Sequence, residues 1–568
     1  MKKIISMLLV GCLSLSVAAC GSKKETDTSS SPEPTKAGTT TEATKPVDAE
    51  PAEIVDGRFT ETRKITVEVY DRANDGGSKP EDNFYTDYIK EGMLRDHNVE
   101  VTFVPVPRWT EVEQINNLLA SGTAPDICVT YDYSTIQTYA NMGGVLDLSE
   151  LVEENRDLLP NLWSWLGETN IYWDKDPATG TIWALEAKLA VMNRINTFVR
   201  EDWLKKLNIA EPTSLEEFEA MLKAFQDNAS VLLGADADKM VPFSISFDVG
   251  WRAEHLIGSF IPNDITDKDY YVNGFDDRKL LQPGTKEAIR VLNKWYNDGL
   301  VWKDFALYPA GDATEDNMMK AGYVGAFIHN WDYPYRNGED SIQRNLERLV
   351  GEDAAYIAIE PFKNDAGIYK KFLAGPIDRK VFFPSTNDEP VASLMYLDWI
   401  SNPENRIFLQ IGEEGVTHEV QPDGAIKTLA ATGEKIMNSG FNIDYTITCN
   451  GLDFGDTEKT VKSIALGYAG IDSRLIEKAF AISAKDGRIG QNVNVGAIAA
   501  EEGQGPALSA KRDTLLDQSV VVPVDQFDST FDSGLADYLS SGGQAIIDER
   551  KAAWEKTFGD STSLPAAK

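Results

Sequence analysis

The chain has 568 residues, is 42% hydrophobic and carries a formal net charge of −35 at pH 7. A charge so negative opposes the counterion release that drives binding to nucleic acids, so nucleic acid is excluded as a partner. The length exceeds what one hydrophobic core organises, which predicts more than one structural unit. No HExxH, GxSxG, Walker A or CxxC motif is present in the sequence.

The N-terminus has the anatomy of a secretory signal. Met1-Lys2-Lys3 is positively charged, and residues 4–17 form an apolar run that is too short to span a bilayer. The segment Val17-Ala18-Ala19-Cys20-Gly21 resembles the lipobox of bacterial lipoproteins. This resemblance implies a signal peptide over residues 1–19, cleavage before Cys20 and a diacylglyceryl group on the Cys20 thiol. We therefore expect a lipid anchor on the extracellular face of the cell membrane, in an envelope of Gram-positive type. In the alternative, the signal is an ordinary one and Cys20 is incidental.

A polar segment follows the lipobox. Residues 20–58 are predicted to include the lipidated cysteine and a disordered tether, because large apolar side chains are scarce as far as about residue 51. No later stretch is apolar over roughly 18 residues, so the lipid is the only membrane contact that we expect. Beyond the tether the cysteines are Cys128 and Cys449. They either form a disulfide or remain two buried thiols, and the second alternative is favoured.

Strand and helix patterns alternate at the start of the globular part. Residues 64–70 (KITVEVY) alternate polar and β-branched side chains, which predicts a strand. The same reasoning predicts helices over 83–96 and 109–121, and strands over 99–106 and 126–130. The order βαβαβ is typical of a parallel sheet covered by helices.

The loops that follow these strands are candidates for a binding crevice. Ligands of open parallel sheets bind outside the carboxyl ends of the strands. The loops after Tyr70, Val106 and Thr130 should therefore meet at one edge of the sheet. They bring to that edge the candidate ligand-binding residues Arg108, Trp109, Tyr131, Asp132 and Tyr133.

Motifs along the rest of the chain identify a family. Residues 121–127 read SGTAPDI, a small-Gly-x-x-Pro-Asp-Ile pattern. Further motifs follow in order: YANMGGVLDL at 139–148, REDWL at 200–204 with Pro212, Thr213, Ser214 and Phe218, GYVGAF at 322–327 with Trp331, FPS at 383–385 with Asn402-Pro403-Glu404, and EEGVTH at 413–418. Together they resemble the family 1 extracellular solute-binding proteins of bacteria, the sugar binders of ABC importers.

The resemblance implies an α/β fold of two lobes, the type II periplasmic-binding-protein-like fold, with hinge strands and an interlobe cleft. It places the first crossing between lobes near 187–197 and the return near 379–384. Ligand would stabilise a closed form that the permease recognises. The expected organisation is lobe 1 over 59–190, lobe 2 over 191–378, a return to lobe 1 over 379–424, and a C-terminal segment over 425–568, mostly of lobe 2 and of helices that cover the hinge.

Sugar chemistry suggests further site residues. A sugar ring has an apolar C–H face that suits tryptophan and hydroxyl groups that need polar partners. Trp331 matches the stacking tryptophan of the family, which makes Trp331, Asp332 and Tyr333 the first candidates in lobe 2. Trp251 and Arg252 are weaker candidates, as are Arg108 and Trp109, because Trp109 could equally be a packing residue at the start of a helix. Glu413 is a further candidate for the cleft, with an exposed carboxylate at a helix end as the alternative.

Metals and cofactors are not expected. The histidines His97, His255, His329 and His418 lack the spacing of metal ligands. Some relatives carry a calcium loop after the helix that follows the DWL segment. Residues 227–239 of this chain lack the dense Asn-Gly spacing and the paired carboxylates of such a loop, so calcium is not favoured there.

The sequence therefore predicts a monomeric, non-enzymatic lipoprotein that captures an oligosaccharide and passes it to ABC permease subunits. Two alternatives remain at this point. A peptide-binding relative would use aromatic side chains in a similar way. An exported glycoside hydrolase needs two carboxylates across a scissile bond, and counting acidic residues does not exclude such a pair.

Overall fold

The computed structural model describes residues 53–564, apart from 74–76, 177–178, 277, 309–311, 369–370, 376, 430–432, 469, 486, 490–492, 494, 497 and 502–503. The predicted signal peptide, the lipidation site Cys20 and most of the predicted tether lie outside the described residues. Among the described residues, no helix is long and apolar enough to cross a membrane.

The first sheet combines strands from distant parts of the chain. β3 (Arg63–Asp71) runs parallel to β4 (Val99–Pro107) and also pairs in parallel with Ile127 through Val67. β5 (Cys128–Thr130) is antiparallel to β12 (Ile377–Phe382), which in turn is antiparallel to β6 (Leu185–Leu189). β15 (Cys449–Asn450) lies parallel to β6. The predicted βαβαβ unit is confirmed, with its strands within two residues of the expected bounds.

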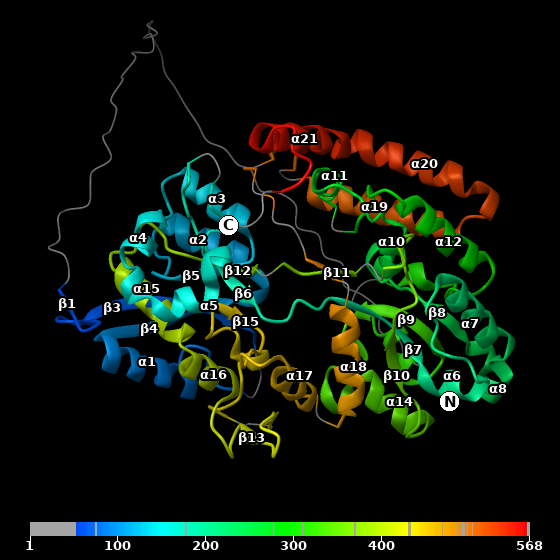
Figure 1. The fold of residues 1–568 in the computed structure, drawn as a ribbon, viewed down its shortest axis with the longest axis horizontal. Coiled ribbons are helices and arrows are strands. Elements are labelled where there is room, and N and C mark those ends of the chain that lie inside the picture. Colours follow the sequence, from blue (N-terminus) through cyan, green and yellow to red (C-terminus); the bar gives the residue numbers. More distant parts are fainter. Residues whose placement is uncertain are drawn as a thin grey trace, which may run out of the picture. The chain divides into compact units, whose positions relative to one another are not determined.

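Helices pack around this sheet and complete lobe 1, the unit on the left of Figure 1. α1 begins at a capping box in which the Asn83 side chain accepts backbone N–H groups and Thr86 reciprocates. α15 is apolar along most of its length and is buried from Ala392 to Ser401. The helices are α1 (Phe84–His97), α2 (Glu111–Ser121), α3 (Tyr133–Asn141), α4 (Ser149–Glu154), α5 (Pro160–Ile171), α15 (Pro390–Ser401) and α16 (Pro403–Ile411).

The contact between α1 and α15 depends on a glycine. A Cβ atom placed on Gly92 would overlap the indole ring of Trp399. We expect Gly92→Ala to lower the free energy of unfolding by about 1–3 kcal/mol, although alanine is the better helix former, because overpacking outweighs propensity. Gly505→Ala is the control, since nothing lies within 4 Å of a Cβ there. Urea unfolding checks both variants, and a Gly92→Ala protein as stable as wild type would contradict the overlap.

The second sheet organises lobe 2, on the right of Figure 1. Its strand order is β10-β7-β9-β8, with β8 parallel to β9 and the other pairs antiparallel. Its strands are β7 (Ile195–Arg200), β8 (Val241–Ser244), β9 (Val324–Asn330) and β10 (Tyr356–Ile359). Its helices include α6 (Glu201–Leu207), α7 (Leu215–Asp227), α9 (Val249–Arg252), α10 (Glu254–Phe260), α12 (Thr285–Asn297), α13 (Thr314–Lys320), α14 (Ile342–Val350), α17 (Thr457–Leu466) and α18 (Ser473–Ala484).

The chain passes between the two sheets more than once (Figure 1). The first crossing joins β6 to β7. The return passes β11 (Lys371–Leu373) and ends before β12, a few residues earlier than predicted, because β12 already belongs to the lobe 1 sheet. The backbone N–H of Ala374 donates to the carbonyl of Met192 at 3.0 Å and joins these two crossings. A further crossing follows β15, since Ile447 lies in the lobe 1 core and Leu452 in the lobe 2 core.

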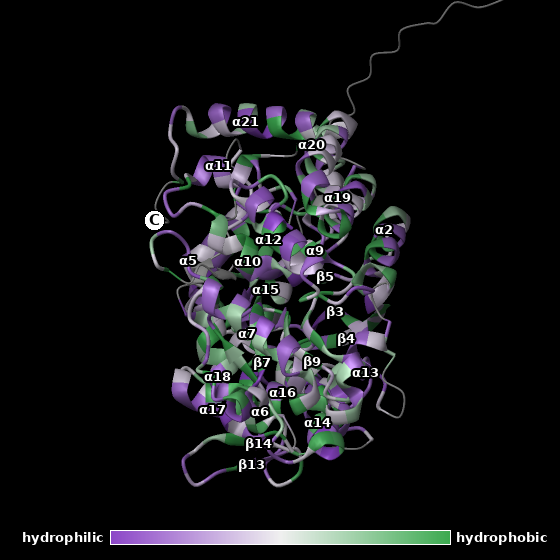
Figure 2. Cartoon of the chain, turned by 90° about the vertical axis from the view of Figure 1, so that its right-hand side faces the viewer, coloured by the Kyte–Doolittle hydropathy of each residue, from purple (hydrophilic) through white to green (hydrophobic). Residues whose placement is uncertain are grey.

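Three C-terminal helices pack on lobe 2 against α11 (Asp267–Val272) and α12. They are α19 (Gly505–Val521), α20 (Phe527–Tyr538) and α21 (Gln544–Phe558). The Asn293 amide in α12 donates to the carbonyls of Ser519 and Val520 in α19, at 3.0 Å each. Hydrophilic and hydrophobic residues alternate around α21 in Figure 2, as expected of a helix with one face on the protein and one in solvent.

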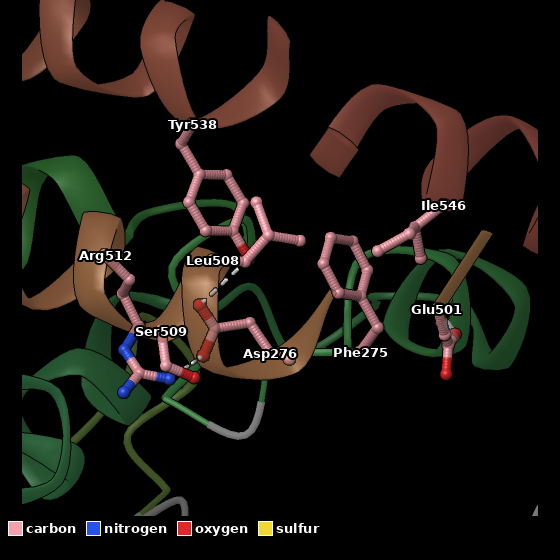
Figure 3. Close-up of a pocket in the computed structure, with 9 residues that line it drawn as sticks. Phe275, Asp276, Glu501, Leu508, Ser509, Arg512, Tyr538 and Ile546 are labelled. Carbon is pink, nitrogen blue, oxygen red and sulfur yellow. Dashed lines mark hydrogen bonds and ion pairs between the residues drawn. The ribbon is translucent and has the colours of Figure 1, made fainter. Parts of the chain in front are cut away.

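A cavity of about 160 Å³ lies among these helices. At its wall the Asp276 carboxylate accepts hydrogen bonds from Arg512 Nη1 at 3.0 Å and from the Tyr538 hydroxyl at 3.4 Å (Figure 3). The Phe275 ring stacks on Tyr538 at 6.3 Å between centroids. These groups satisfy one another, and they belong to a helix junction rather than to the strand ends of either sheet. We therefore interpret the cavity as part of the packing of the C-terminal helices.

α19 carries a carboxyl group with a raised pKa. Burial, together with Asp513 and Asp248, raises the pKa of half-buried Asp517 from 3.8 to about 7. The folded chain thus keeps this proton to higher pH than the unfolded chain. The protonated Asp517 carboxyl group therefore contributes stability that is fully present below about pH 4 and is lost as the pH rises through 7. Relative to wild type, Asp517→Asn should therefore be more stable at pH 8 than at pH 5. Urea unfolding at both pH values checks this, with exposed Asp525→Asn as control, and equal differences would contradict it.

Candidate ligand-binding site

The three loops at the carboxyl ends of β3, β4 and β5 meet, as the parallel arrangement predicts. The rings of Tyr70 and Tyr131 stack with centroids 6.3 Å apart and planes 15° apart. The Arg108 guanidinium carbon lies 4.3 Å from the Tyr131 ring centroid and 5.1 Å from that of Tyr70. The first cluster of the site is therefore a positive group held against aromatic rings.

Trp109 extends this cluster into solvent. Its side chain is 75% exposed, and Arg108 lies 5.5 Å from its ring. A tryptophan left so exposed beside the carboxyl ends of the strands is available to stack on a ligand. Asp132 and Tyr133 serve local structure, since Asp132 accepts from the Thr135 hydroxyl at 2.8 Å and Tyr133 donates to the Asp174 carbonyl at 3.3 Å.

Two arginines, Arg72 and Arg379, hold the Asp444 carboxylate next to the first cluster. Arg72 donates two hydrogen bonds to the buried Asp444 carboxylate, at 2.6 and 2.9 Å. Arg379 is fully buried, and its Nη1 lies 3.6 Å from the same carboxylate. Burial raises the pKa of Tyr131, while Arg379, Arg108 and Arg72 act in the opposite direction. No sequence motif singles out these residues as site residues. Arg72 directly follows β3 and is recognisable as a strand-end residue, whereas Asp444 and Arg379 come from distant segments.

The second cluster lies at the ends of β8 and β9 in lobe 2. His329 stacks on Tyr333 with ring centroids 3.2 Å apart, and Trp251 meets His329 edge to face at 4.7 Å. His329 Nδ1 accepts the backbone N–H of Asn330 at 2.8 Å. Burial, with Arg252 and Arg336, strongly lowers the pKa of His329, so its ring is neutral and its proton is on Nε2. Within the described part of the chain, this Nε2–H has no hydrogen-bond partner.

A strained backbone positions Trp251. Phe247 follows β8 with φ at +37°, which is unfavourable for a bulky residue. Its neighbour Asp248 caps α9 by accepting the Trp251 backbone N–H at 3.1 Å, and it also accepts from Arg278 Nε at 2.6 Å. The turn therefore fixes the place of a half-buried tryptophan whose ring lies 5.9 Å from Phe247.

Trp331 and Asp332 are more enclosed than the sequence suggests. The Trp331 side chain is 8% exposed and packs edge to face on Phe480 at 5.4 Å and on Tyr468 at 6.3 Å. Asp332 accepts from Arg336 Nε and from the Tyr468 hydroxyl, both at 2.6 Å. The hydroxyl of half-buried Tyr333 donates to Asp316 at 2.9 Å. Ligand binding by these residues stays a prediction, and Tyr333 is the one whose ring joins the second cluster.

Arg252 and Glu413 occupy opposite environments. Arg252 is fully buried; it donates to the Glu315 carboxylate at 2.6 and 2.8 Å and also to the Ile328 carbonyl. Glu413 has a half-exposed side chain that pairs with Lys435 at 2.7 Å. Arg252 therefore fixes α9, the helix that carries Trp251, to β9 and α13. A role of Arg252 or of Glu413 toward a ligand remains a prediction.

Both clusters lie on the side of their sheet where the chain crosses between lobes. Thr130 at the end of β5 pairs with Lys380 in β12, the strand that the return crossing enters. In lobe 2 the backbone N–H of Trp331, just after β9, donates to the carbonyl of Arg194 in the first crossing, at 2.9 Å. Aromatic and polar groups of both lobes thus border the hinge.

Metal ligands and a disulfide do not contribute to this site in the described residues. Those residues contain no group of three or more His, Cys, Asp or Glu side chains that could hold a metal ion. In the former calcium-loop candidate, Asp236 pairs with Lys239 at 2.8 Å. Cys128 and Cys449 are free buried thiols, which confirms the alternative that the sequence favours.

Comparison with known proteins shows which family the chain resembles in sequence. The sequence profile of the family described as "Bacterial extracellular solute-binding protein" matches residues 89–431. The chain is 20% identical over 472 residues to the polygalacturonan/rhamnogalacturonan-binding protein YtcQ of Bacillus subtilis (strain 168), which covers 81% of this chain and 86% of YtcQ. It is 21% identical over 359 residues to lipoprotein LipO of the same organism, which covers 60% of this chain and 65% of LipO.

Solved structures with the same fold include two named for glycan binding or transport. The alginate-binding protein AlgQ2 aligns with a TM-score of 0.54 at 17% identity, over 87% of this chain and 98% of AlgQ2. The HMO binding ABC-transporter associated solute binding protein from Bifidobacterium longum infantis aligns with a TM-score of 0.58 at 13% identity, over 87% of this chain and 99% of that one. These alignments confirm the two-lobe α/β fold.

Proposed function

Because the chain belongs to the family of bacterial extracellular solute-binding proteins, we propose that it captures an oligosaccharide outside the cell and delivers it to the permease of an ABC importer. One observation carries this proposal. Each lobe borders the hinge with aromatic rings beside a donor group that makes no hydrogen bond to the described residues: Arg108 with Tyr131 and Trp109 in lobe 1, and the Nε2–H of His329 with Trp251 and Tyr333 in lobe 2.

Such a pair of walls suits a sugar. The C–H face of each ring stacks on an aromatic side chain, and the hydroxyl groups accept from the guanidinium and from His329 Nε2–H. Since the walls belong to different lobes, a ligand that touches both stabilises the closed arrangement by its differential affinity. The permease would then recognise the loaded, closed form. The names of relatives such as YtcQ and AlgQ2 support a carbohydrate as ligand.

The proposal includes a lipid anchor at Cys20 and no turnover of the ligand. The lipobox supports the anchor, and LipO, a relative named as a lipoprotein, supports it further. A binding protein must release its cargo unchanged, so no bond of the oligosaccharide is cleaved.

Thermal unfolding of the lipid-free protein, residues 53–568, against a panel of oligosaccharides and peptides tests the function. A ligand at 100 times its Kd should add about 2.7 kcal/mol of stability, which appears as a raised Tm. Incubation of each hit with the protein, followed by chromatography, measures cleavage.

The outcomes are distinct. A raised Tm with at least one oligosaccharide, without cleavage, supports the proposal. A raised Tm with peptides alone contradicts the carbohydrate assignment and favours the peptide-binding alternative. Cleavage of the oligosaccharide contradicts a pure binding role and favours the glycoside hydrolase alternative.

A further inference from the structure

Arg108 differs from the other arginines of its cluster in what its guanidinium does. Arg72 gives two hydrogen bonds to Asp444, and Arg379 donates to the carbonyls of Thr446 at 3.2 Å and Cys449 at 2.9 Å. Arg108 donates no hydrogen bond to any described residue, and its Nε is buried without a partner. Its side chain is 21% exposed, so part of it is accessible to a ligand.

Aromatic rings hold this guanidinium in place. Tyr131, Tyr70 and Trp109 have ring centroids at 4.3, 5.1 and 5.5 Å from its central carbon. A planar group stacked in this way loses little rotational freedom when it binds a ligand. Arg108 is therefore preorganised, and its hydrogen-bonding fork is unused.

The ion-pair partner of Arg108 is engaged elsewhere. Glu111 Oε1 accepts the Tyr131 backbone N–H at 3.0 Å and the Thr130 hydroxyl at 3.3 Å. Glu111 Oε2 lies 3.4 Å from Arg108 Nη1, in an ion pair without a hydrogen bond. Glu111 thus positions the Tyr131 loop and neutralises Arg108 only in part.

The charge around the cluster allows an anionic ligand. Asp444 is bound by Arg72, and Asp378 accepts from the Asn450 amide at 2.7 Å. Around Tyr131 and its neighbours, Arg72, Arg108 and Arg379 face Glu111, Asp378 and Asp444. The nearby Glu68 carboxyl has its pKa raised well above its usual value by burial and by Glu111 and Asp444, which favours its neutral form. In a chain with a net charge of −35, a balanced patch is a place where an acidic ligand meets little repulsion.

Closure of the lobes would remove water from Arg108. A neutral sugar offers it hydroxyl groups, which are weaker partners for a desolvated guanidinium than a charged acceptor is. A carboxylate accepts two parallel hydrogen bonds from the same fork and neutralises the charge. On this ground, and resting on the proposed function, we propose that Arg108 binds a carboxylate of the glycan, so that the ligand is an oligosaccharide containing hexuronic acid.

The test compares matched ligands. Calorimetry measures Kd for uronic-acid trisaccharides (galacturonic, mannuronic and guluronic) and for their methyl esters, which keep the sugar backbone and lose the charge. Wild type should bind at least one acid roughly 10-fold or more tightly than its ester. Arg108→Gln should remove this difference by weakening the acid alone, and Arg108→Lys should keep part of it. Raising NaCl should weaken acid binding to wild type but not to Arg108→Gln.

A stacked arginine elsewhere provides the control. Arg156 lies 3.8 Å from the Trp163 ring centroid in lobe 1, so Arg156→Gln removes a similar contact away from the strand ends and should leave acid binding unchanged. If wild type binds only neutral glycans, or binds ester and acid equally, the carboxylate assignment is overturned while the proposed function stands. Binding of peptides alone overturns both. If Arg108→Gln loses affinity for acid and ester alike, the carboxylate assignment is also overturned, because Arg108 would then contact the neutral part of the sugar.

Discussion

Replacing Glu315 by glutamine is expected to lower the free energy of unfolding by about 3–5 kcal/mol. The reason is the buried guanidinium of Arg252, which is 0% exposed and donates to both carboxylate oxygens of Glu315 at 2.6 and 2.8 Å. Glutamine keeps the shape but removes the charge, and it turns an amide N–H₂ toward a group that can only donate. Urea unfolding of the lipid-free protein measures the loss.

An exposed pair supplies the comparison. Glu413 pairs with Lys435 at 2.7 Å, with side chains 49% and 33% exposed. Glu413→Gln should cost less than about 1 kcal/mol, because water screens the pair and solvates the remaining lysine. If Glu315→Gln and Glu413→Gln lower the free energy of unfolding equally, burial of the Arg252–Glu315 pair does not determine the loss of stability.

Trp251→Ala is expected to weaken binding of the oligosaccharide found in the screen by about 30-fold or more. The ring stands between Phe247 and His329 at the hinge side of lobe 2, and truncation leaves the sugar face without a platform while the His329 donor remains. Calorimetry gives the Kd, and thermal unfolding of the free variant verifies that lobe 2 is still folded.

Trp331→Ala distinguishes this assignment from the one that the sequence favours. Trp331 is 8% exposed, so its truncation should mainly cost stability, about 3–5 kcal/mol, and affect binding only as far as the lobe is destabilised. If Trp331→Ala abolishes binding in a folded protein and Trp251→Ala leaves the Kd unchanged, the stacking platform is Trp331.

Local sequence patterns suffice for the first part of lobe 1. Period-two alternation and β-branched side chains locate β3 and β4, and the parallel order of the strands brings Arg108 beside Tyr131. The family motifs supply the two-lobe fold. These signals are all local: each depends on residues that are close together along the chain.

The rest depends on contacts that no local pattern encodes. Asp444 reaches Arg72 from 372 residues away. Trp331 follows a strand as a loop residue would, but Phe480 of α18 and Tyr468, just after α17, enclose it. His329 lies inside an apolar strand, and only the stacking of Tyr333 and Trp251 beside it makes its free nitrogen part of a site.

The lobe 1 sheet takes strands from Arg63 to Asn450, and this arrangement determines the order in which the protein can fold. A chain that is synthesised or exported from its N-terminus presents β3, β4 and β5 early, while β12 and β15 arrive only after all strands of the lobe 2 sheet have emerged. Lobe 2 can thus complete its sheet first, and until β12 arrives the apolar edge of β5 is unpaired. The slow step of maturation should then be the late insertion of β12 between β5 and β6, a long-range event with a high entropic cost.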